Sequence, residues 1–139
     1  MNPQEILHTK KLKHTGCREG ILSLILESDF ALSENEIRDK LDGRFDRTTF
    51  YRSFKTLLEN DIIHKIVVDN QMVKYAFDKQ KSNTVGHAHF FCKSCRSVVC
   101  LETTSAVNIK LPGGYKVHET EIIIRGKCNR CSGSKKKHE

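Results

Sequence analysis

The chain has 139 residues, with 24 Lys or Arg, 17 Asp or Glu and six cysteines, and its formal net charge is +7. This length accommodates one ordinary domain or two small ones, and a hydrophobic content of 37% excludes wholesale disorder. No stretch approaches the roughly 18 uninterrupted apolar residues of a membrane span, and residues 1–16 hold no apolar run of signal-peptide length, so we expect a cytoplasmic protein without membrane partners.

The positive charge is unevenly distributed along the chain. Residues 1–85 carry 14 basic and 13 acidic side chains, whereas residues 86–139 carry 10 and 4. Three of the C-terminal positive charges form the run Lys135 to Lys137, which is typical of a solvated tail. Net charge is therefore poor support for nucleic-acid binding.

Helical patterns predominate before about residue 80. Asn2-Pro3 is typical of a helix start, Ser33 and Glu36 form a capping box, and Asp46 suits an N-cap. Apolar periodicity completes the prediction. The predicted helices are a short one from Pro3 to near Lys11, one over 17–28, a short one after Ser33 that buries Ile37 and Leu41, and one over 47–59.

Two β-branched segments follow these helices. Residues 62–68 and 72–77 are separated by a short polar turn, which predicts a β-hairpin. Three helices followed by a hairpin form a winged helix-turn-helix, in which the helix over 47–59 enters the DNA major groove. The alternative from pattern alone is a small α+β unit that binds protein.

The C-terminal part predicts strands instead of helices. After a polar stretch over 78–86, the segments HFFC, SVVCLE and VHETEIIIRG each predict a short strand. Residues 103–110 suggest one short helix, and Pro112-Gly113-Gly114 predicts a turn.

Two CxxC pairs predict a metal site. Cys92 and Cys95 form one pair, and Cys128 and Cys131 form the other, with 32 residues between the two pairs. Two such pairs supply the four thiolates of a tetrahedral structural Zn(II) site. A reducing compartment disfavours the alternatives of disulfides or uncommitted thiols, and a redox CxxC would need a βαβ context that the sequence lacks.

A histidine pair precedes the first CxxC pair, or cysteine knuckle. His87 and His89 face the same side of a strand, so both imidazoles can bind one metal. Cys92 lies on the opposite face by the same parity, which favours a second metal ion. The alternative is that both histidines are exposed polar residues.

Several other potential ligands lie outside these groups. We expect Cys17 and Cys100 to be small buried hydrophobes. His118, Glu119 and Glu121 are weaker candidates for a further metal site.

These motifs resemble the ferric uptake regulator (Fur) family of metal-responsive transcription factors over roughly residues 14–131. HAHFFCKSCRSVVCLE resembles the family's HxHxxCxxC segment, GKCNRC its closing CxxC, and TGCREGIL its TxQRxxIL helix start, with Cys17 in place of Gln. RTTFYRSFKTLLENDII resembles its recognition helix.

The resemblance implies an α+β protein that forms a homodimer on a double-stranded operator. It implies a winged-helix domain over 1–80, a linker over 81–86, and an α/β dimerisation domain over 87–139 that carries the four-cysteine zinc and a basic tail. The candidate DNA contacts are Arg47, Thr48, Thr49, Tyr51, Arg52, Lys55, Arg18 and Lys13.

The regulatory metal site departs from the family pattern. Where iron- or manganese-sensing members have a loop His and a wing carboxylate, this chain has Ala31 and Ala76. Zinc-sensing members use a wing Asp and a following Cys, whose places match Asp69 and Asp78. The candidate ligands for a regulatory Zn(II), Fe(II) or Mn(II) ion are therefore His87, His89, Asp69 and Asp78.

The sequence accordingly predicts a metal-responsive repressor of metal uptake or homeostasis genes. One alternative is a diverged regulator with structural zinc only, and another is a zinc-stabilised protein-interaction module. A peroxide sensor is disfavoured by Ala31. An enzyme is disfavoured because a four-cysteine zinc leaves no open position for a substrate, and no HxE or HExxH motif occurs.

Overall fold

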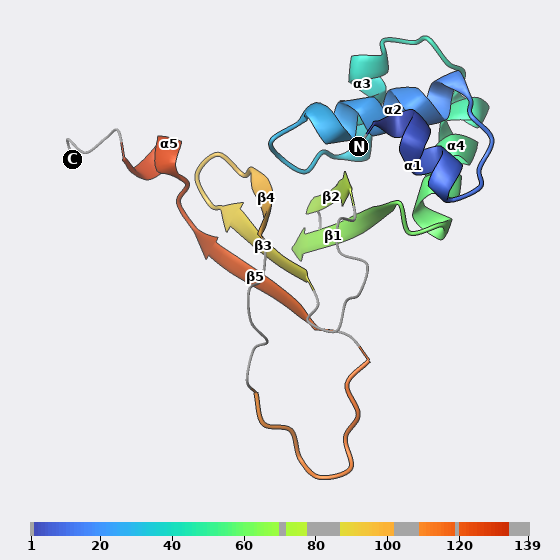
Figure 1. Ribbon diagram of the computed structural model, residues 1–139. Coiled ribbons are helices and arrows are strands. Elements are labelled where there is room, and N and C mark those ends of the chain that lie inside the picture. The colour runs from blue at the N-terminus through green and yellow to red at the C-terminus, as the bar shows by residue number, and fades with distance from the viewer. Residues whose placement is uncertain (1, 70–71, 78–86, 102–108, 119, 134–139) are drawn as a thin grey trace. The chain divides into compact units, whose positions relative to one another are not determined.

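The computed structural model describes residues 2–69, 72–77, 87–101, 109–118 and 120–133. The chain divides into two compact units, Met1–Lys79 and Gln80–Glu139 (Figure 1). The predicted linker over 81–86 lies outside the described residues, so the domain boundaries stay predictions. Among the described residues, no helix has both the length and the apolar character needed to cross a membrane.

Four capped helices open the first unit. A side-chain oxygen of Asn2, Thr15, Ser33 or Asp46 accepts a backbone N–H in the first turn of each helix, which supplies partners for the otherwise unsatisfied donors there. The four helices are α1 (Pro3–Thr9), α2 (Gly16–Glu27), α3 (Glu34–Leu41) and α4 (Arg47–Glu59).

The first helix is shorter than predicted. It ends at Thr9 because Lys10 leaves helical geometry and Lys11 adopts a left-handed backbone with φ of 59°. The helix predicted over 17–28 begins one residue earlier and ends one residue earlier, at Glu27.

The predicted hairpin forms the wing. Strands β1 (Ile63–Asp69) and β2 (Met72–Phe77) pair in antiparallel fashion. Leu32 and Tyr75 exchange backbone hydrogen bonds of 3.0 and 2.7 Å. Lys74 Nζ lies 3.1 Å from Glu36 Oε1. The segment before α3 and α3 itself are thus both attached to the wing.

One hydrophobic core holds this unit together. It takes residues from every helix, and α4 contributes Phe50, Phe54 and Leu57. The ring of Phe54 also packs edge to face against the ring of Tyr75, which lies in the wing, with centroids 4.7 Å apart. The helices and the wing therefore bury a shared apolar surface.

The second unit contains a three-stranded sheet in the order β4-β3-β5. Its elements are β3 (His87–Cys92), β4 (Val98–Leu101), β5 (Glu121–Gly126) and the short helix α5 (Asn129–Ser132). Strand β3 pairs antiparallel with β4 and parallel with β5 (Figure 1).

The predictions for the second unit differ in outcome. The last strand begins at Glu121, four residues later than predicted, and helix α5 was not predicted. The helix predicted over 103–110 falls mostly on 102–108, outside the described residues. The turn is present, because Tyr115 N–H donates to Pro112 O over 3.3 Å.

The predicted α+β class is confirmed, with a winged helix-turn-helix followed by a small α/β unit that carries a four-cysteine cluster.

The fold of the first unit should depend on Leu57. Its side chain is 0% exposed, so Leu57→Ala should lower the free energy of unfolding by about 2–5 kcal/mol through lost burial and a residual cavity. Urea unfolding followed by circular dichroism measures this change. Lys55→Ala on the exposed face of the same helix is the matched control, because its ion pair with Glu59 is solvated and contributes little. Equal effects from the two substitutions would contradict this core.

Candidate metal centre

Parallel pairing brings the two cysteine knuckles together. Cys92 ends β3, and its register partner Gly126 ends β5 two residues before Cys128. Lys93 N–H donates to Gly126 O over 2.7 Å, which keeps the two chains adjacent beyond the strands. Both CxxC pairs therefore lie at the same end of the sheet.

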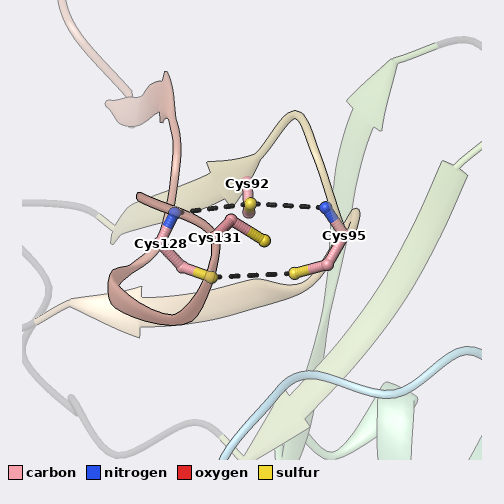
Figure 2. Close-up of side chains that lie close together, drawn as sticks. All are labelled: Cys92, Cys95, Cys128 and Cys131. Atoms are coloured by element: carbon pink, nitrogen blue, oxygen red, sulfur yellow. Dashed lines mark hydrogen bonds between the residues drawn. The ribbon is translucent and has the colours of Figure 1, made fainter. Parts of the chain in front are cut away.

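The four thiols converge on one point (Figure 2). All four sulfur atoms lie within 4.8 Å of one another, and Cys95 Sγ lies 3.7 Å from Cys128 Sγ. A tetrahedral zinc with bonds of about 2.3 Å separates its sulfurs by about 3.8 Å. The cluster thus has the dimensions of a four-thiolate zinc site.

Backbone amides surround one of these sulfurs. The N–H groups of Cys95 and Cys128 each donate to Cys92 Sγ over 3.4 Å (Figure 2). These two hydrogen bonds lower the pKa of Cys92 to about 5, and the bond from Cys95 has the larger effect. The first knuckle therefore offers a thiolate at neutral pH, the form that binds metal.

The second knuckle shows the opposite shift. A hydrogen bond with the Cys128 side chain is the largest cause that raises the pKa of Cys131, to about 12. Four adjacent thiols cannot all ionise without a cation, because each thiolate disfavours the next. A divalent cation supplies the missing charge, and Arg130, whose Nη2 lies 3.8 Å from Cys95 Sγ, adds a further positive charge.

This site suits a structural metal. Zn(II) accepts four thiolates and retains no open position in such a site. The residues fit the predicted structural zinc, whose role is to connect β3 to β5.

The histidine pair lies on β3, the strand that ends at Cys92. His89 is 1% exposed, and its Nε2 lies 3.6 Å from Glu121 Oε2 on β5. The side chain of His87 is outside the described residues, as is that of Asp69, and Asp78 is outside them altogether. The structure therefore places one of the four predicted regulatory ligands and adds Glu121 beside it.

The two remaining cysteines differ. Cys17 is buried, as predicted, and its Sγ lies 3.9 Å from Thr49 O. The expectation of a buried Cys100 is wrong, because this residue is exposed on β4 opposite His89. Val98, two residues earlier on the same strand, is 0% exposed, so the burial of β4 ends before Cys100.

The candidate DNA contacts gather on two adjoining segments. Arg18 Nη1 donates to Lys13 O over 2.8 Å, so the start of α2 holds the loop that precedes it. The predicted contacts on α4 are all exposed, whereas its other face lies in the core. The exposed contacts are Arg47, Thr48, Thr49, Tyr51, Arg52 and Lys55.

Ala31 and Ala76 are both buried in the first unit. Their methyl groups fill apolar space and offer no metal ligand.

Residues 9–124 match the ferric uptake regulator family. This match ends before the second cysteine knuckle, so the four-cysteine cluster is supported by its geometry. A search of curated proteins found no match.

Solved structures share the fold. One is a zinc uptake regulator complexed with zinc and DNA, with 20% identity, a TM-score of 0.66, and coverage of 96% of this chain and 92% of that one. Another is the ferric uptake regulator of Francisella tularensis with iron, with 23% identity, a TM-score of 0.62, and coverage of 86% and 94%. A zinc-bound manganese uptake regulator has 14% identity, a TM-score of 0.63, and coverage of 90% and 98%.

Zinc binding should depend on the second knuckle. Cys128→Ser should reduce tightly held zinc from one ion per chain to near zero, because the site loses a thiolate. Elemental analysis after gentle chelation measures the content, and Cys100→Ser, which removes an exposed thiol outside the cluster, should retain the ion.

Zinc removal should also unfold the second unit, since binding free energy at such a site is folding free energy. Strong chelation should abolish its amide protection in hydrogen exchange and leave the helices of the first unit protected. A zinc-free protein with an intact second unit would contradict this role.

Proposed function

The chain belongs to the ferric uptake regulator family, and we propose that it is a metal-responsive, sequence-specific DNA-binding transcriptional regulator that represses metal uptake or homeostasis genes. The observation that carries this proposal is the exposed face of α4, which presents cations, hydroxyls and an aromatic ring from a winged helix. The zinc uptake regulator of the same fold was solved with zinc and DNA, which supports the same pairing here.

The chemistry of α4 suits a major groove. Arg47, Arg52 and Lys55 supply positive charge for phosphates or guanine edges, and threonine hydroxyls near the helix start can donate to phosphate. Tyr51 is 38% exposed and can contact a thymine methyl. Asp46 Oδ1 accepts the N–H of Thr49 over 2.8 Å, which fixes the first turn that carries these groups.

A homodimer suits the second unit. Strand β5 is an outer strand of the described sheet, and its Ile124 is 48% exposed. An exposed strand edge with apolar side chains can pair with a second copy. Two-fold symmetry would then place two recognition helices on a palindromic operator, as the symmetry of helix-turn-helix dimers requires.

We propose that the regulatory metal binds at β3. Its ligands would be His87 and His89, and Asp69 and Asp78 are the candidate carboxylate ligands. The carboxylate of Glu121 beside His89 supports a cation there, because it supplies charge of the required sign. The buried Ala31 and Ala76 favour the alternative, a diverged regulator with structural zinc only.

DNA affinity should depend on Arg52. Arg52→Ala should weaken operator binding by about tenfold to 100-fold, which corresponds to the loss of a base or phosphate contact, and should leave the tightly held zinc unchanged. Fluorescence anisotropy over a salt series measures the affinity, which should fall steeply with ionic strength. Lys116→Ala removes an exposed cation from the second unit and serves as the control. Unchanged affinity of the Arg52 variant would exclude this docking surface.

A second metal should control DNA binding through His89. Gentle chelation that leaves the structural zinc in place, followed by reloading with Zn(II), should raise operator affinity about 5–150-fold, the usual range of allosteric coupling. His89→Gln should abolish this response and retain the structural zinc, whereas His8→Gln, which removes an exposed histidine of α1, should respond as the wild type does. One zinc per chain with no metal effect on DNA affinity would select the structural-zinc-only alternative.

A further inference from the structure

An arginine on α3 lies over two aromatic rings of the recognition helix. The guanidinium carbon of Arg38 is 5.9 Å from the ring centroid of Phe50 and 5.8 Å from that of Tyr51. Both distances are within the range of cation–π attraction. Arg38 therefore contacts the exposed ring of α4 from the neighbouring helix.

The two rings have different roles. Phe50 is 3% exposed and belongs to the core, whereas Tyr51 is 38% exposed. They meet edge to face, with centroids 5.3 Å apart and planes at 79°. Phe50 thus provides a fixed surface, and Arg38 spans from that surface to the solvent-facing Tyr51.

The fixed surface extends to the wing. Phe50 stacks on Phe54 at 5.6 Å, and Phe54 meets Tyr75 of β2 at 4.7 Å. A continuous row of side chains therefore connects Arg38 and Tyr51 to the wing. A ring that packs against such a row has fewer accessible rotamers than an exposed tyrosine on an isolated helix face.

We propose that Arg38 is a positioning residue that holds the Tyr51 ring in the orientation needed to read a base, so that it sets sequence preference through Tyr51. This inference rests on the proposed DNA-binding function. A planar guanidinium can stack on a ring, whereas the compact ammonium of lysine keeps the charge without the same stacking. Arg38→Lys therefore separates positioning from simple phosphate attraction.

The experiment selects binding sites from a duplex library with a randomised core of about 20 base pairs, two helical turns. Wild type, Arg38→Lys, Arg38→Met and Tyr51→Ala are compared with Lys40→Met, which removes a cation from the same helix. Both Arg38 variants should lose preference at the base positions that Tyr51→Ala also loses, by about two- to fivefold per position. Preference elsewhere should stay at the wild-type value.

Coupling provides a readout that a purely structural role would not change. Arg38→Met combined with Tyr51→Ala should lose no more preference than Tyr51→Ala alone, because Arg38 acts through that ring. Additive losses would overturn the inference. An Arg38→Lys protein with full preference would also overturn it, particularly if Arg38→Met weakened binding to all sequences equally and reduced the salt dependence.

A failure of the DNA-binding function can be distinguished from a failure of the positioning role of Arg38. A wild-type protein that enriches no sequence contradicts the DNA-binding function and this inference with it. Wild-type enrichment with unaltered Arg38 variants contradicts only the positioning role. Ring resonances of Tyr51, one of three tyrosines in the chain, report the packing itself, and they should shift in Arg38→Met.

Discussion

The parallel pairing of β3 with β5 is the constraint on which the second unit depends. Parallel neighbours cannot be joined by a tight turn, so the chain leaves β3, forms β4 on one side, and returns as β5 on the other. Only this arrangement places Cys92 and Cys128 at the same end of the sheet. The metal site is therefore a consequence of strand order, and the metal in turn holds strands that few local contacts favour.

The two units differ in what stabilises them. The first buries side chains from four helices and the wing in one core, and each helix start is capped. In the described part of the second, the buried apolar side chains are few, among them Ala88, Phe91 and Val98. A small core such as the one in these described residues favours a further constraint such as a metal. This difference separates a rigid surface on α4 from a sheet whose integrity depends on an ion.

Local signals predicted most of the first unit because caps and apolar spacing act within a few residues. Ser33 and Asp46 mark helix starts that the structure retains. The start of β5 was harder to predict, because the residues before Glu121 have strand-like composition without a partner strand in the described sheet. Arg38 was not singled out, since a charged residue on a short helix resembles any solvated one until the rings of α4 are placed beside it. The exposure of Cys100 depends on which side chains pack over β4, and no local sequence pattern states this.

The separation between the knuckles also has a consequence for the order of synthesis. Cys95 and Cys128 are 33 positions apart, and a ribosome adds about 5–20 residues per second. The first two thiols are therefore complete about 2–7 s before the last knuckle, and no sheet can yet close over them. During this interval only two of the four zinc ligands exist, so the complete four-thiolate site cannot form. Zinc binding at the complete site is therefore one of the last steps in the folding of the second unit.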